Sequence, residues 1–138
     1  MIVAPPSPPE IIVDASIVVK WLRSEGETNV SAARRLRQQY RRGELAIAAP
    51  SLLYLEVLNV AARRWRWRPA RLSRLVSRLR VLAFTVQEPP LERVAYWSGK
   101  GLTAYDACYL ALAEHRRCVL VTADDELSAA GGRLVRSL

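Results

Sequence analysis

The sequence predicts a three-layer α/β/α domain with a mostly parallel central sheet. Short apolar runs alternate with one or two helical patterns along the chain, which is the order of elements found in such sheets. Two of these runs are closely followed by an aspartate, and ligands of open parallel sheets bind just beyond the carboxyl ends of strands. A length of 138 residues suits one domain, and a hydrophobic content of 51% excludes a disordered chain.

The domain is expected to span residues 11–138, after a lead-in at residues 1–10 that contains the extended, proline-rich run APPSPP. No apolar run is long enough to cross a membrane, and the N-terminus lacks the pattern of a signal peptide, so we expect a cytoplasmic protein. Its two cysteines, Cys108 and Cys118, are expected to be reduced thiols. Together with the single His115 they do not make a zinc site.

Five short apolar runs are the predicted strands. The first and fourth are rich in isoleucine and valine, as expected for strands that are buried on both faces of a sheet. A final run near the C-terminus follows two glycines and is expected to form an edge strand. The predicted strands are residues 11–13, 45–48, 83–86, 119–121 and 134–135.

Helical periodicity and capping residues place the helices between these strands. Ser16 is a candidate cap for a helix with a buried face that includes Val18 and Trp21. Thr103 and Asp106 have the spacing of a capping box and open an apolar helix at residues 104–114. Its buried face is expected to contain Tyr105, Cys108, Tyr109 and Leu112, which recur at helical spacing. The other predicted helices are residues 27–42, 50–64, 91–98 and 125–130, with one more within residues 63–80. In the helix at 50–64 and just after it, Leu55, Leu58, Ala62 and Trp65 are expected to form the apolar stripe.

The charge balance predicts an anionic partner. The net charge is +8, and residues 63–80 contain eight arginines and no acid. Leucine and valine residues keep a helical period through this stretch, so it is expected to be a folded helix. A solvated basic surface without a partner is the alternative. The residues expected to contact RNA or a protein partner are Arg66, Trp67, Arg68, Arg71 and Arg74.

Three aspartates are candidates for one acidic site. Asp14 directly follows one predicted strand, Asp124 follows another after two residues, and Asp106 opens the helix before the second of these strands. If the two strands are neighbours, carboxylates about 4.8 Å apart repel one another unless they are protonated or neutralised by a cation. Mg²⁺ binds a few carboxylates and generates a hydroxide nucleophile, so the acids and the basic surface together indicate a metal-dependent nuclease.

Each acid also has a simpler interpretation. Asp106 alone is explained as a helix cap, and Asp124 alone as a turn residue. Glu56 shares a helix face with Asn59, one turn away, and such a face is usually solvated. The nuclease interpretation therefore depends on whether these acids converge on one edge of the sheet.

Several segments together resemble the PIN-domain ribonucleases, specifically the VapC-type toxins of toxin–antitoxin pairs. The segments are IIVDASIVVKWL, APSLLYLEVLNVAARR, LTAYDACYLALAE and VLVTAD, in the order typical of that family and over residues 11–127. The resemblance implies Mg²⁺ or Mn²⁺, cleavage of RNA by an activated water, a homodimer, and an antitoxin that inserts a segment into the toxin groove. It implies an acidic metal site made of Asp14, Glu56, Asp106 and Asp124, with Ser16, Asn59 and Thr122 in supporting positions.

The chain departs from the family pattern at its C-terminal end. Asp125 follows the last motif aspartate, where family members often carry a basic residue, and it is a further candidate for a supporting role near the metal. The chain also ends soon after Gly132, so a short final strand is expected.

Two other functions stay open. One is a PIN-domain nuclease of RNA processing that has no antitoxin. The other is a non-catalytic module that binds RNA or protein, although all four motif acids are present. A receiver-like phosphoacceptor is disfavoured because Asp14 has no acidic neighbour before Glu25.

Overall fold

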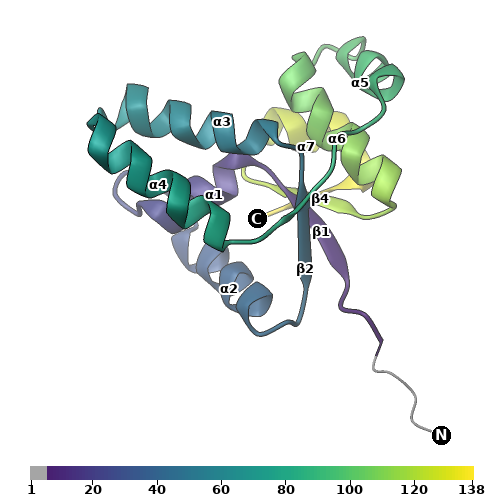
Figure 1. Ribbon diagram of the computed structural model, residues 1–138. Coiled ribbons are helices and arrows are strands. Elements are labelled where there is room, and N and C mark those ends of the chain that lie inside the picture. Colours follow the sequence, from purple (N-terminus) through teal and green to yellow (C-terminus); the bar gives the residue numbers. More distant parts are fainter. Residues whose placement is uncertain (1–5) are drawn as a thin grey trace, which may run out of the picture.

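The computed structural model describes residues 6–138, which form a five-stranded parallel sheet with helices on both faces (Figure 1). The strand order is β3-β2-β1-β4-β5, and every neighbouring pair is parallel. This confirms the predicted α/β architecture with a parallel sheet. The strands are β1 (Glu10–Val13), β2 (Ala46–Ala49), β3 (Thr85–Val86), β4 (Val119–Thr122) and β5 (Val135–Ser137).

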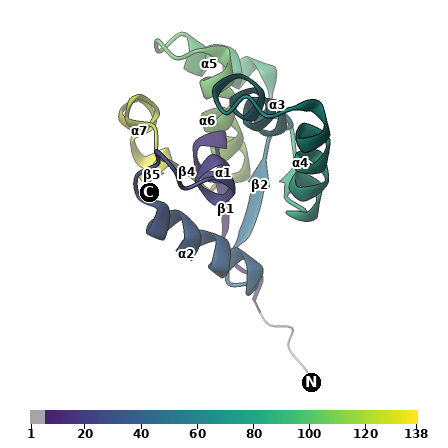
Figure 2. The ribbon, with the colours of Figure 1, turned by 90° about the vertical axis from the view of Figure 1, so that its left-hand side faces the viewer.

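The order of the strands decides which helices cover which face. The chain moves from β1 outward to β2 and β3, and then crosses back past β1 to β4 and β5. Right-handed crossovers in opposite directions place the two sets of helices on opposite faces, as Figures 1 and 2 show. One face carries α1 (Ala15–Leu22), α2 (Val30–Arg41), α3 (Leu52–Asn59) and α4 (Pro69–Val81), and the other carries α5 (Leu91–Ser98), α6 (Ala104–Arg116) and α7 (Asp125–Gly131).

The core is built where α1 and α6 pack on β1 and β4 from opposite sides. Ile12 and Leu120 are fully buried in neighbouring strands, and Ile17 of α1 and Leu110 of α6 are fully buried above and below them. A strand that is covered on both faces needs apolar side chains at successive positions, which is why the two runs read as continuous hydrophobic segments.

Some element boundaries differ from the sequence-based expectation for local reasons. The second helix begins at Val30, because Asn29 has a left-handed φ of 53°. Glu27, expected inside that helix, instead lies 3.3 Å from the ammonium group of the buried Lys20. Ala83 has a φ of 53°, so the predicted strand 83–86 is reduced to its last two residues.

The buried stripe of α3 was also predicted wrongly. Leu53, Val57 and Ala61 are fully buried at a spacing of four residues, whereas Leu55, expected in the core, is 66% exposed. Tyr105, expected on the buried face of α6, is 64% exposed and lines a concavity together with Leu55.

Residues 6–9 of the proline-rich lead-in are exposed and lie outside helices and strands, while residues 1–5 lie outside the described part. Among the helices of residues 6–138, none has the length and apolar character required to cross a bilayer.

Candidate active site

Asp14 lies where β1 and β4 run side by side and the chain leaves them toward opposite faces. It directly follows β1 and precedes α1, and Val13 pairs with Val121 of β4. Only 6% of Asp14 is exposed, although it is an acid at the edge of the sheet. The condition set by the sequence, that the two aspartate-terminated strands be neighbours, is met.

The Asp14 carboxylate is held by two hydroxyl groups. Ser16 Oγ donates to Oδ1 at 2.5 Å, and Thr122 Oγ1 donates to Oδ2 at 2.5 Å. Ser16 Oγ also accepts from the Ala123 N–H at 3.1 Å, and Thr122 Oγ1 accepts from the Asp124 N–H at 3.0 Å. The expectation that Ser16 caps α1 is therefore wrong. Its hydroxyl instead links the end of β1 to the end of β4.

Asp124 and Asp106 both begin helices. The Asp124 carboxylate caps α7 by accepting from the Leu127 N–H at 3.0 Å. Thr103 Oγ1 caps α6 by accepting from the Asp106 N–H at 3.1 Å, as the sequence predicted for this pair. Both aspartates are half-buried, so part of each carboxylate stays accessible.

Glu56 reaches the site from α3 and is fixed by a residue that the sequence did not indicate. The hydroxyl of Tyr109 donates to Glu56 Oε1 in a short hydrogen bond. Tyr109 is 1% exposed, and its helical spacing with Tyr105 and Leu112 had indicated only a core residue. Asn59 lies on the same face of α3 as Glu56, and both line a concavity of 390 Å³ together with Tyr105.

The carboxylates influence one another electrostatically. Burial raises the pKa of Asp14, and the negative charge of Asp124 also raises it. The hydrogen bonds from Ser16 and Thr122 lower this pKa, but by less than the two other effects raise it. Burial, and then the charges of Asp106 and Asp14, raise the pKa of Glu56. Burial, and then the charges of Asp124 and Glu126, raise the pKa of Asp106. We call Asp14, Glu56, Asp106 and Asp124 the acid cluster.

The chemistry of the acid cluster fits a hard divalent cation. Its oxygen donors are the ligands that Mg²⁺ and Mn²⁺ prefer. Among residues 6–138, no arginine, lysine or histidine forms an ion pair with these carboxylates, in agreement with their raised pKa values. Within residues 6–138, no three acid, histidine or cysteine side chains lie close enough to enclose an ion without rearrangement.

Asp125 is exposed in the first turn of α7. The charge that acts on Asp106 from this turn is that of Glu126, which the sequence did not indicate.

The arginine-rich stretch folds as predicted except at one residue. Leu75 and Leu79 of α4 are buried. Trp67, which was expected to be available to a partner, is only 9% exposed and belongs to the core, because the turn before α4 folds its ring against Trp65. The arginines expected at a partner surface are exposed, and they are Arg66, Arg68, Arg71 and Arg74.

The cysteines, the histidine and a large concavity all lie outside this chemistry. Cys108 and Cys118 are free, and burial raises the pKa of each thiol to about 11, so both are poor nucleophiles. His115 is exposed at the end of α6.

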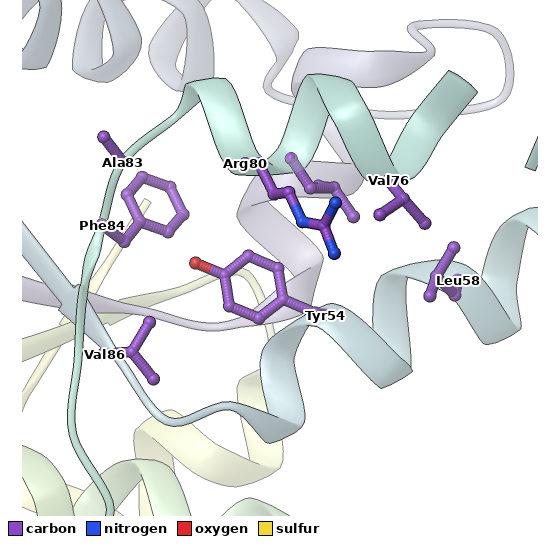
Figure 3. A pocket seen from close by; sticks show the side chains of 8 residues that line it. Tyr54, Leu58, Val76, Arg80, Ala83, Phe84 and Val86 are labelled. Atoms are coloured by element: carbon purple, nitrogen blue, oxygen red, sulfur yellow. The ribbon is translucent and has the colours of Figure 1, made fainter. Parts of the chain in front are cut away.

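A concavity of 420 Å³ between α3, α4 and β3 is mostly apolar, and Figure 3 shows Tyr54 of α3 facing Arg80 of α4 across it.

Replacing Thr122 by valine is expected to lower the free energy of unfolding by about 2 kcal/mol, because Asp14 loses a donor and the Asp124 N–H loses its acceptor. Thermal or urea unfolding measures this loss. Thr122→Ser keeps the hydroxyl and removes only a methyl group, so it is the matched control. Equal losses in the two variants would contradict a role for the hydroxyl.

Comparison with known proteins places this geometry in a family. A sequence model described as PIN domain matches residues 11–133. No match is found among curated proteins. The structure is similar to PAE2754 from Pyrobaculum aerophilum, with 27% sequence identity, a TM-score of 0.66, and coverage of 94% of this chain and 89% of that chain. It is also similar to VapC20 from Mycobacterium tuberculosis, a Sarcin-Ricin loop cleaving toxin, with 17% identity, a TM-score of 0.66, and coverage of 91% and 98%.

Proposed function

Because this chain belongs to the PIN-domain family, which indicates a nuclease, we propose that it is an endoribonuclease dependent on Mg²⁺ or Mn²⁺ and the toxin of a toxin–antitoxin pair. The observation that carries the proposal is the buried Asp14 carboxylate at the switch point of the sheet, surrounded by acids from α3, α6 and the end of β4. Carboxylates that repel one another in this way destabilise the folded protein unless a bound cation neutralises them.

The acid cluster is the proposed cation site. Asp14, Asp106, Asp124 and Glu56 would supply its carboxylate oxygens. When bound, a divalent cation polarises a phosphodiester and lowers the pKa of a coordinated water, which makes a nucleophile available near neutral pH.

The residues around the acids hold them in place. Ser16 and Thr122 donate to both Asp14 oxygens and so restrict its rotation, and Tyr109 restricts Glu56 in the same way. Asn59, exposed beside Glu56 in the concavity, would donate an amide hydrogen bond to the RNA. The net charge of +8 favours approach of a polyanion.

The toxin assignment, with a homodimer, a partner antitoxin and a cytoplasmic location, is the more specific part of this proposal. It is supported by the fold that the chain shares with VapC20. The test is to express the protein alone and together with the gene beside its own, and to map the new RNA 5′ ends. Discrete 5′ ends that disappear on co-expression are expected. Cleavage that the neighbour leaves unchanged would identify a nuclease without antitoxin, and no cleavage would favour a binding module.

Divalent cations are expected to raise the melting temperature of the purified protein. They bind the folded acid cluster and not the unfolded chain, and a cation at 100 times its dissociation constant stabilises by about 2.7 kcal/mol. Differential scanning fluorimetry with Mg²⁺, Mn²⁺ or chelator measures the shift. Asp14→Asn is expected to abolish most of it, and a melting temperature indifferent to both ions would count against the cation site.

A further inference from the structure

The turn that joins α3 to α4 contains an arginine in a strained conformation. The π-helical segment Val60–Arg64 continues α3, and the Trp67 N–H closes the turn by donating to the Ala61 carbonyl at 3.0 Å. Arg66 has a φ of 55°, in the left-handed region that glycine usually occupies just after a helix. Both π-helical turns and left-handed non-glycine residues are concentrated at functional sites.

Two indole rings support guanidinium groups at this turn. The ring centroids of Trp65 and Trp67 are 5.1 Å apart. The guanidinium carbon of Arg71 lies 3.8 Å from the centre of the Trp67 ring, and that of Arg23 lies 5.5 Å from the Trp65 ring. Stacking on a ring orients a guanidinium group while its N–H edge stays available to an anion.

The exposed arginines of this turn and of the start of α4 form no ion pair within residues 6–138. The ion pairs formed by arginine there involve Arg23, Arg64, Arg93 and Arg116, and none involves Arg66, Arg68, Arg71 or Arg74. The four arginines line an open concavity of 470 Å³ beside the two indole rings. We call these residues the arginine patch: Arg66, Arg68, Arg71 and Arg74.

We propose that the arginine patch is a second RNA-binding site, which holds backbone phosphates of the strand whose cleaved bond lies at the acid cluster. This inference rests on the proposed nuclease function. Glu56 of the acid cluster lies on the helix that leads directly into the turn. The arginine patch begins at Arg66, ten residues after Glu56, which is about 15 Å at the rise of an α-helix. One single strand that follows α3 can therefore reach both sites.

The chemistry of the arginine patch favours RNA over an acidic protein. Guanidinium groups match phosphate oxygens with two parallel hydrogen bonds, and four of them without carboxylates suit a regularly charged backbone. A protein partner also needs an apolar contact surface, but Arg71 covers the Trp67 ring here. The apolar groove of the same helix pair lies elsewhere, against Phe84 and Val86 (Figure 3).

The test is to replace all four residues of the arginine patch by glutamine in an Asp14→Asn background, which prevents cleavage. Affinity for a fluorescent single-stranded RNA of roughly 12 nucleotides, long enough for a typical single-strand site, is measured by anisotropy across a salt series. The expected result is a loss of affinity of roughly 10- to 100-fold, with a slope of log K against log salt that is lower by about 2 to 3 units.

A matched variant separates a site from general attraction. Replacing Arg34, Arg35 and Arg41 of α2, and Arg42 directly after it, by glutamine removes the same charge from another exposed surface. This variant is expected to bind nearly as tightly as the parent. Equal losses in the two quadruple variants would reduce the arginine patch to a part of the general basic surface and overturn the proposal. A polyglutamate peptide that binds the parent as tightly as RNA and is equally weakened would also overturn it, in favour of an acidic protein.

A single substitution separates a loss of RNA binding from a loss of folding. Arg66→Gly relieves the left-handed strain and removes one phosphate contact. We expect an unchanged or higher melting temperature together with an RNA affinity that is roughly threefold lower. An unchanged affinity would show that Arg66 serves only the turn.

The outcomes distinguish this inference from the nuclease proposal, because binding is measured on protein that cannot cleave. Patch-dependent binding with no cleavage by the parent would leave this site in place and reject the nuclease. Cleavage by the parent, together with an RNA affinity that is unchanged in the quadruple variant, would support the nuclease and reject the arginine patch as a binding site.

Discussion

An Asp14→Asn variant is expected to lose RNA cleavage by roughly 10³-fold or more while it keeps the fold. The amide has the shape of the carboxylate and can still meet Ser16 and Thr122, but it lacks the charge that holds a hard cation. Cleavage of a labelled RNA by highly purified protein measures the loss. Glu44→Gln, which neutralises an exposed acid in a turn, is the control for the change in net charge.

The same variant is expected to be more stable than the parent when no cation is present. Burial raises the folded pKa of Asp14 above its ordinary value of 3.8, so the folded state binds a proton more tightly than the unfolded state. The parent therefore has its full stability from this group below pH 3.8 and loses it as the pH rises through the raised pKa. Asparagine does not titrate, so the variant lacks this loss and melts a few degrees higher at pH 7.

Two results would contradict the role given to Asp14. Full cleavage by the variant would remove it from the catalytic site. A lower melting temperature at pH 7 in chelator, with Glu44→Gln unchanged, would mean that the two hydroxyl donors stabilise the charged form by more than burial destabilises it.

A Gly131→Ala variant is expected to lose about 2–3 kcal/mol of unfolding free energy and to melt roughly 5–10 °C lower. A Cβ at this position would lie 2.3 Å from Val135 Cγ2 and 2.7 Å from Leu110 Cδ2, inside the contact distance of both. Leu110 is fully buried and valine has few rotamers, so neither side chain can move away without cost. The end of α7 or β5 must shift instead.

A second substitution tests whether overpacking is the cause. Val135→Ala removes the methyl group that lies nearest to the added Cβ, so the double variant Gly131→Ala, Val135→Ala is expected to recover part of the loss. Thermal unfolding of the two single variants and the double variant gives the coupling. Strictly additive losses would show that the clash with Val135 is not responsible.

The sequence alone determined the local features of this protein. The apolar runs at 11–13 and 119–121 could be identified as buried strands because such strands need apolar residues at successive positions. Asp14 and Asp124 then had to lie at the carboxyl ends of strands, and Thr103 had the spacing of a cap. These features depend on neighbours within a few residues, which a periodic pattern records.

Tertiary structure alone decided which distant residues meet. No pattern in the sequence pairs Tyr109 with Glu56, or Ser16 with the backbone at Ala123, because these contacts join segments 53 and 107 residues apart. The burial of Trp67 and the exposure of Leu55 also depend on how neighbouring elements pack. Helical periodicity defines the faces of α3, but only the position of the sheet and of α4 determines which face is covered.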